Sequence, residues 1–142
     1  MEHVDHEVGS NGFVTLVLVS HSATIARGVA ELVGQVAGPE VSIVAVGGAG
    51  DGSLGTDGAQ VLEALRQAAA GAGAVVLMDI GSSVLAVRAA FGELTPEELA
   101  GLYAADAPLV EGAIAAGVTA STGADAREVA RAAEEARNVG KL

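Results

Sequence analysis

The sequence predicts one doubly wound α/β domain, with a mainly parallel four-stranded sheet in the strand order 2-1-3-4 and helices on both faces. Short, continuous apolar runs alternate with amphipathic segments through most of the 142 residues. Such uninterrupted runs are typical of strands buried on both faces of a parallel sheet, because helices cover them from both sides. The length suits a single domain with a sizeable core. The alternation therefore predicts the class, and the crossovers between strands are expected to be right-handed.

Four apolar runs are the predicted strands, and each ends in turn-forming residues. They occupy residues 13–20, 41–46, 74–79 and 102–108. The fourth pattern is the weakest, and Pro108 ends it because proline cannot donate to a strand ladder. The glycine-rich segment 47–57 follows the second strand as a loop, and the IGSS segment 80–83 turns the third strand into a helix.

Helix signals follow each predicted strand. The first helix begins at Ser22, because a serine hydroxyl accepts hydrogen bonds from the first amides of a helix. Apolar residues at spacings of three and four form its predicted core face: Ile25, Val29, Leu32, Val33 and Val36. Thr56 or Asp57 is the expected cap of the second helix, and Thr95 followed by a proline marks another helix start. The last two helices are predicted over residues 109–121 and 124–137.

Composition excludes several function classes. The chain has no cysteine, which excludes disulfides and thiolate chemistry. Its net charge of −11 argues against nucleic acid and anionic membranes as partners. There is no long apolar span and no basic leader before a short apolar run, so we expect a cytoplasmic protein without a membrane segment. Residues 1–12 are polar and without periodicity, and they are predicted to be a disordered leader.

The predicted topology brings two titratable residues to one place. In open α/β sheets the ligand site lies beyond the carboxyl ends of the strands, at the point where the winding reverses. For the order 2-1-3-4 this point lies between the first and third strands. His21 follows the first strand and Asp79 ends the third, so both are expected in the same crevice. The glycine-rich loop after the second strand lies next to it.

A histidine beside a carboxylate is a chemically complete arrangement for covalent catalysis. A neutral imidazole is a nucleophile near pH 7, and Asp79 can accept a hydrogen bond from Nδ1 of His21, which leaves the Nε2 lone pair outward. A phosphoryl group on Nε2 needs hydrogen-bond donors for its oxygens. The helix starts at Ser22 and at Ser82-Ser83 offer amides and positive dipole ends for them. Arg27 and Arg88 are further candidates, for charge compensation or for partner contacts, and Arg27 is expected to face solvent.

Simpler roles exist for each of these residues. The histidine can be a structural hydrogen-bonding residue, Asp79 a turn or cap residue, and residues 47–57 a flexible loop. Other motifs are absent: the glycine-rich loop lacks the lysine of a Walker loop, no GxGxxG follows the first strand, and G-x-S-x-G is missing. His3, His6 and His21 do not form a plausible metal site, so no metal is expected. The convergence of several features at one switch point favours the functional interpretation.

Four segments together resemble a known family. They are LVLVSHS (16–22), LGTD (54–57), VVLMDIGSS (75–83) and APLVEGAIAA (107–116). In their order and spacing they resemble the phosphotransferase subunit of the bacterial, phosphoenolpyruvate-dependent dihydroxyacetone kinase system. Its main domain is similar to the mannose-type enzyme IIA of the phosphotransferase system. The resemblance extends over about residues 13–137, and it implies that residues 13–142 form one such domain.

The resemblance implies roles for individual residues. His21 matches the family's phosphorylated histidine, and Asp79 matches the aspartate that pairs with it. The phosphate-side turn corresponds to Gly81, Ser82 and Ser83, and Ser22 opens the helix on the other side of the phosphate. Loop contacts are expected from Gly48, Thr56 and Asp57.

The resemblance also implies partners. A histidine-phosphorylatable carrier protein donates the phosphoryl group, and ADP bound on the kinase's nucleotide-binding subunit accepts it. No cofactor is expected on this chain itself, and a homodimer is implied. Two alternatives stay open: an enzyme IIA of mannose-type sugar uptake, which passes phosphate to a IIB domain, and a non-catalytic regulatory domain of the same fold. Mannose-type sugar transporters carry a tryptophan and Gly-Gly-Ser-Pro after their aspartate, so the IGSS turn favours the dihydroxyacetone branch.

Overall fold

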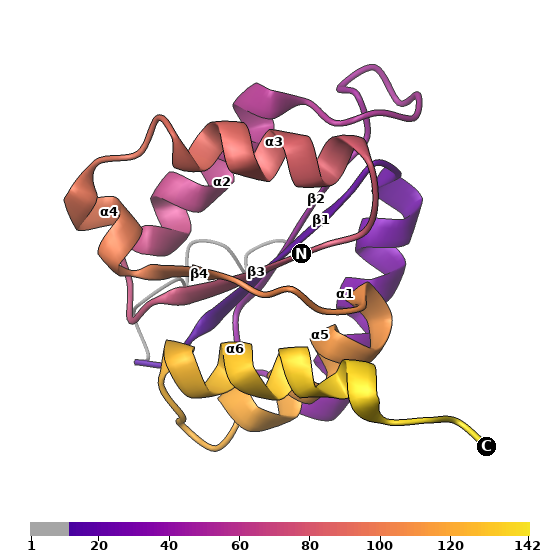
Figure 1. Ribbon diagram of the computed structural model, residues 1–142, viewed down its shortest axis with the longest axis vertical. Helices are drawn as coiled ribbons and strands as arrows, with labels where there is room; N and C mark the ends of the chain where they lie inside the picture. Colours follow the sequence, from indigo (N-terminus) through magenta and orange to yellow (C-terminus); the bar gives the residue numbers. More distant parts are fainter. Residues whose placement is uncertain (1–11) are drawn as a thin grey trace.

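The computed structural model describes residues 12–142, which form a sheet between two layers of helices (Figure 1). The leader predicted for residues 1–12 lies outside these described residues, apart from Gly12. Between residues 12 and 142, every helix is too short or too polar to cross a membrane.

The sheet has the predicted topology. Its strands are β1 (Thr15–Ser20), β2 (Ile43–Gly47), β3 (Ala74–Met78) and β4 (Leu102–Ala104). They lie in the order β2-β1-β3-β4 and all neighbouring pairs are parallel, which confirms the predicted fold class. At the carboxyl end of β1, Ser20 pairs with Gly47 of β2 and Val19 with Met78 of β3. The ends of these three strands therefore meet at one edge of the sheet.

The fourth strand is shorter than predicted. The sequence predicted residues 102–108, but β4 ends at Ala104 and one more backbone bond follows, from Ala105 to Val76. The amide of Asp106 donates instead to the side chain of Glu134, 3.0 Å away. Residues 106–108 leave the sheet and lead into the next helix, so only three residues of β4 pair with β3.

Three helices cover each face of the sheet (Figure 1). On one face lie α1 (Ala23–Ala37), α5 (Leu109–Ala120) and α6 (Ala126–Glu135), followed by a short 3₁₀ helix, Ala136–Asn138. On the other lie α2 (Gly58–Ala69), α3 (Ser82–Phe91) and α4 (Pro96–Ala100). The helix start predicted at Thr95 is confirmed by a capping box and opens α4 as a separate helix. Two helices, α3 and α4, thus connect β3 to β4.

Strand β1 is buried on both faces, as its sequence predicts. Leu16 and Leu18 face the core under α1, α5 and α6, whereas Val17 and Val19 face the core under α2, α3 and α4. All four side chains are fully buried. Because β1 is packed from both sides, the residues at its carboxyl end are held in fixed positions.

The predicted apolar face of α1 is wrong in part. The buried positions are Ala26, Val29, Val33 and Ala37, whereas Ile25, Leu32 and Val36 are exposed. Small residues face the core because α1 approaches α5 closely: a Cβ added to Gly117 would lie 2.6 Å from Val33 Cγ1. Apolar periodicity alone could not predict this, since both stripes have helical spacing.

Candidate functional site

The structure brings His21 and Asp79 into contact at the carboxyl edge of the sheet. Nδ1 of His21 lies 2.8 Å from Oδ2 of Asp79, although the two residues come from different strand ends. The backbone fixes this juxtaposition, because the amide of Asp79 donates to the carbonyl of Val19 at 3.1 Å. The site lies between β1 and β3, at the winding reversal that the sequence analysis identified.

His21 is the single residue between the end of β1 and the cap of α1. Ser22 has the extended backbone of an N-cap, and its hydroxyl accepts from the amide of Ile25 at 3.2 Å, which confirms the predicted cap. The carbonyl of Ser22 accepts the first helical bond, from Ala26. A buried strand on one side and a capped helix on the other leave His21 little backbone freedom.

The carboxylate of Asp79 accepts several hydrogen bonds at once. The hydroxyls of Ser20 and Ser83 each donate to it at 2.6 Å, to Oδ2 and Oδ1 respectively. The amide of Ile80 donates at 2.6 Å and that of His21 at 3.3 Å. Burial raises the pKa of Asp79, but these hydrogen bonds outweigh it and lower the pKa to about 2. Asp79 is therefore an anion at neutral pH.

The charge of Asp79 determines the tautomer of His21. A carboxylate anion is only an acceptor, so Nδ1 carries the hydrogen of the 2.8 Å contact. In the neutral ring Nε2 is then left with its lone pair. The side chain of His21 is 29% exposed and that of Asp79 is 11% exposed, so a partner can reach the imidazole while the carboxylate stays largely covered.

Ser20 is a site residue that the sequence analysis missed. It is fully buried, its hydroxyl donates to Asp79, and the same oxygen accepts from the amide of Ser22 at 3.0 Å. A signal was present in the sequence, because a serine that ends a continuous apolar strand must find a buried partner. The amide of Ser22, expected to face a phosphate, is thus already engaged. The amides of Ala23 and Thr24 precede the first intrahelical bond and are the remaining donors of that turn.

The turn after β3 was expected to face the phosphate, but one of its residues, Ser83, points inward. The hydroxyl of Ser83 is buried and donates to Asp79, and its amide donates to the carbonyl of Ile80. Ser83 therefore holds the carboxylate rather than facing outward. Gly81 is the N-cap of α3 and has a φ of 57°, a conformation that favours glycine. Ser82 is exposed, and its hydroxyl lies 2.7 Å from that of Thr56 in the glycine-rich loop.

The glycine-rich loop folds back onto the site. The amide of Gly55 donates to the carbonyl of His21 at 2.8 Å, and Thr56 forms an isolated parallel bridge with Gly48. Asp57 caps α2, since its carboxylate accepts from the amides of the two residues that follow Gly58. A Cβ on Gly47 would lie 2.7 Å from the carbonyl of Ser22, so the loop can approach the histidine turn only because this residue is glycine.

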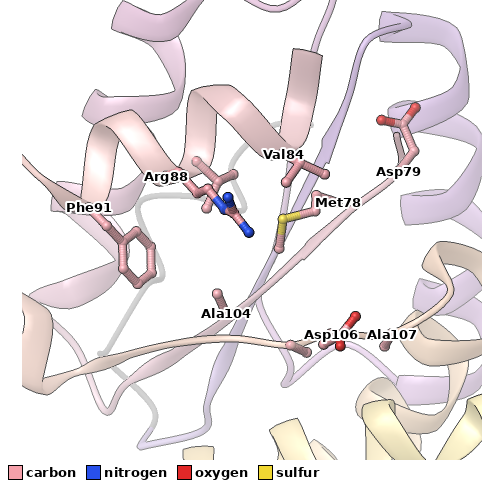
Figure 2. A pocket seen from close by; sticks show the side chains of 10 residues that line it. Met78, Asp79, Val84, Arg88, Phe91, Ala104, Asp106 and Ala107 are labelled. Atoms are coloured by element: carbon pink, nitrogen blue, oxygen red, sulfur yellow. The ribbon is translucent and has the colours of Figure 1, made fainter. Parts of the chain in front are cut away.

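The two candidate arginines lie on opposite sides of the site. Arg88 lines a hollow of about 500 Å³ beside Asp79, together with Phe91 and Asp106, and Figure 2 shows its guanidinium turned into this hollow. Arg27 is exposed and lines a different hollow, between α1 and β2. Within residues 12–142, no group of three or more His, Asp or Glu side chains is arranged to hold a metal ion.

The fold and this site together define a class: a parallel α/β domain that presents an aspartate-oriented histidine at the carboxyl edge of its sheet. The family model described as "EIIA-man: PTS system fructose IIA component" matches residues 15–130. A solved structure titled "Crystal structure of unknown function protein EF1359" has a TM-score of 0.78 and 33% sequence identity, and the match covers 92% of this chain and 97% of that one.

Curated relatives make the class more specific. The phosphoryl donor subunit DhaM of the PEP-dependent dihydroxyacetone kinase of Escherichia coli is 39% identical over 119 residues, which are 82% of this chain and 25% of that protein. The corresponding subunit of kinase 2 of Listeria innocua is 37% identical over 105 residues, 74% of this chain and 84% of that protein. The chain belongs to the mannose-type enzyme IIA family, and it is similar in sequence to proteins named as phosphoryl donor subunits of PEP-dependent dihydroxyacetone kinases. It spans about a quarter of the length of the Escherichia coli relative.

Proposed function

We propose that this chain is the phosphoryl carrier of a PEP-dependent dihydroxyacetone kinase. Nε2 of His21 accepts a phosphoryl group from the histidine-phosphorylatable carrier protein and passes it to ADP bound on the kinase's nucleotide-binding subunit. The ATP formed there phosphorylates dihydroxyacetone, and residues 13–142 make up the phosphotransferase domain. The observation that carries the proposal is the 2.8 Å contact between Nδ1 of His21 and the anionic Asp79.

The chemistry follows from the fixed tautomer. The Nε2 lone pair attacks phosphorus as the nitrogen–phosphorus bond of the donor breaks, so one bond forms and one is lost. The phosphorylated ring of His21 gains positive charge, and the Nδ1–H bond to Asp79 stabilises that charge. In the second step an oxygen of ADP attacks the same phosphorus, and the Nε2 lone pair is restored. Asp79 holds the ring in place throughout and takes up no proton, because its pKa is about 2.

The negative charge of a phosphoryl group on His21 must be compensated, because the chain is already acidic. The group adds roughly −1.5 to −2 charge by analogy with other phosphorylated residues, whereas the chain already has a net charge of −11. The N-terminal ends of α1 and α3 both lie at the His21 edge. The amides of Ala23 and Thr24 on α1 and of Ser82 on α3 are suited to bind its oxygens, because the next amides of α3 already donate to the carbonyls of Ile80 and Gly81. We assign the exposed hydroxyls of Ser82 and Thr56 to the same role, with Arg88 as the nearest candidate cation on the Asp79 side.

Intact-mass measurement tests the first step. The protein is mixed with phosphoenolpyruvate, enzyme I and the carrier protein, and the expected result is a gain of one phosphoryl group that acid removes. His21→Ala should gain none, whereas the control His6→Ala should be labelled like the wild type. Equal labelling of His21→Ala would show that another residue carries the phosphate.

The acceptor is tested with the labelled protein. Addition of the ADP-loaded nucleotide-binding subunit should remove the phosphate and form ATP, whereas a IIB domain of a mannose-type sugar-uptake system should leave it in place. Transfer to the IIB domain alone would support the sugar-uptake role instead. The homodimer implied by the resemblance stays a prediction, which analytical ultracentrifugation tests.

A further inference from the structure

The hollow of about 500 Å³ beside Asp79 has the character of a binding site (Figure 2). Most of its wall is apolar and comes from β3, α3 and the end of β4 with the residues that follow it. Three charged side chains also line it: Asp79, Arg88 and Asp106. Small-molecule sites combine apolar walls with a few polar groups in this way, and this volume lies within their range. The hollow is therefore large enough to take part of a ligand that approaches His21.

Arg88 is the cation that lines this hollow. Between residues 12 and 142 its guanidinium forms no ion pair or hydrogen bond. Asp106 pairs instead with Arg137 at 3.2 Å, and the carboxylate of Asp79 is occupied by the hydrogen bonds described above. The five N–H donors of the Arg88 guanidinium are thus left for a group that comes from outside the chain.

Arg88 lies further along α3 than the groups assigned to the phosphoryl oxygens. Its Cα is about 9 Å along the helix axis beyond that of Ser82, at about 1.5 Å per residue. Side chains on a helix lean back toward its N-terminus, and Figure 2 shows the guanidinium turned into the hollow. Arg88 therefore suits negative charge that extends beyond the phosphoryl group itself.

The two transfer steps differ in the negative charge that they bring to His21. In the first step one phosphoryl group passes from one histidine to another. In the second step the diphosphate of ADP must also lie against the phosphohistidine, close to the anionic Asp79 and on a chain with a net charge of −11. Repulsion between these anions opposes the second step in particular. An unpaired arginine beside them lowers that repulsion.

Resting on the function proposed above, we propose that Arg88 binds the diphosphate of the acceptor ADP in this hollow and so acts in the second step. The nucleotide stays on its own subunit, and its diphosphate end enters the hollow. The planar guanidinium donates two parallel hydrogen bonds to phosphate oxygens. A terminal oxygen of the β-phosphate attacks the phosphorus on His21, the bond from phosphorus to Nε2 breaks, and its electron pair returns to the ring. Arg88 keeps its protons throughout.

The test measures the two steps separately in three variants. Arg88→Gln removes the charge and keeps a good helix former, whereas Arg88→Lys keeps the charge without the planar fork. The matched control is Arg127→Gln, because Arg127 is also an exposed helix arginine that lines a hollow, but at the amino ends of β3 and β4. The first step is the labelling of His21 by the carrier protein, followed by intact mass. The second is ATP formation in a single turnover of the labelled protein, with the concentration of the ADP-loaded subunit varied.

Arg88→Gln should slow the second step roughly tenfold or more at saturating subunit, and the first step by less than about threefold. Arg88→Lys should recover part of the second-step rate, because the charge is kept. Transfer in reverse, from the ATP-loaded subunit to unlabelled His21, should show the same loss in Arg88→Gln, since both directions pass through one transition state. Arg127→Gln should match the wild type in both steps.

Several results would overturn the assignment of Arg88. Equal losses in both steps would place its action on the phosphohistidine or on the fold, and a loss that disappears at saturating subunit would make it a contact to the partner protein. A wild-type second step in Arg88→Gln, or an equal loss in Arg127→Gln, would also contradict it. Failure of the wild type to be labelled on His21, or of the labelled wild type to form ATP, would instead refute the function on which the assignment rests.

Discussion

Asp57 and Asp79 are the same residue type in almost the same local setting, yet the tertiary structure uses them differently. Each comes shortly before a helix, Asp57 before α2 and Asp79 before α3. The carboxylate of Asp57 accepts from amides two and three residues downstream, at 3.0 and 3.3 Å. That of Asp79 accepts from Ser20 and His21, more than fifty residues upstream.

The difference begins in the turn after β3. There Gly81 is the N-cap of α3, and it has no side chain to cap the helix, whereas Asp57 itself caps α2. Asp79 is two residues earlier: its Oδ1 accepts from Ile80 and Ser83 in its own turn, and its Oδ2 reaches across the strand ends to Ser20 and His21. An aspartate near a helix start is thus structural where its partners are local. It becomes a candidate for chemistry where they come from another strand.

The largest expected effect is the difference in phosphorylation rate when each of the two aspartates is replaced by asparagine. Asp79→Asn removes the anion that fixes the tautomer of His21 and should slow phosphorylation by the carrier protein roughly a hundredfold. Asp57→Asn should leave the rate within about twofold, because asparagine caps helices as well as aspartate does. The rates are measured by intact mass, with circular dichroism to confirm that both variants fold. Equal rates for the two variants would remove Asp79 from the mechanism.

A smaller effect on phosphorylation is expected at Ser20, which acts on His21 through Asp79. Ser20→Ala removes a buried donor to Asp79 and leaves the amide of Ser22 without its acceptor. It should lower the free energy of unfolding by about 1–3 kcal/mol and slow phosphorylation about tenfold.

The matched control is Ser53→Ala. The hydroxyl of Ser53 donates to the carboxylate of Asp51 at 2.6 Å, the same distance as in the Ser20–Asp79 pair, but on the exposed loop. Urea unfolding and labelling rates of this variant should stay close to wild type, because an exposed pair exchanges its bond for one with water. A Ser20→Ala protein with wild-type kinetics would make Ser20 a structural residue only.

The smallest expected effect is the contribution of Asp79 to the pH dependence of the free energy of unfolding. Its pKa falls from 3.8 in the unfolded chain to about 2 in the folded protein, so the stabilisation is fully present above about pH 4 and is lost as the pH falls towards 2. The difference in unfolding free energy between wild type and Asp79→Asn should therefore be constant from pH 7 to 5 and shrink below pH 4. Urea titrations across this range measure it, and a difference that grows below pH 4 would contradict the hydrogen-bonded anion.

Much of the fold could be predicted because its signals are local. The strand runs are continuous and apolar, and Ser22 and Thr95 cap helices as their residue types suggest. The approach of His21 to Asp79 could be predicted as well, since it follows from strand order alone. The length of β4 could not, because the side chain of Glu134, far along the chain, takes the amide of Asp106 out of the sheet.

Other features depend on which elements pack together. On α1 the periodic pattern contains two apolar stripes, and only the close approach of Gly117 to Val33 selects the one with small residues. The exposed stripe consists of Ile25, Leu32 and Val36. Ser83 has the pattern of an outward-facing turn residue, but its hydroxyl turns inward to the carboxylate of Asp79, four residues earlier, and to the carbonyl of Ile80.

By itself, the sequence predicted the parallel sheet, because hydrophobic periodicity and turn residues act over short stretches of chain. With the strand order common to such folds, it also predicted the edge at which His21 and Asp79 meet. Only the tertiary structure decided which hydrogen bonds form at that edge. Ser20 and Ser83 both donate to Asp79 and lower its pKa; the bond from Ser83 lies within the turn after β3, whereas the bond from Ser20 exists because β1 and β3 are neighbours in the sheet. A low pKa depends on the number of donors that meet one carboxylate, and that number is a property of packing.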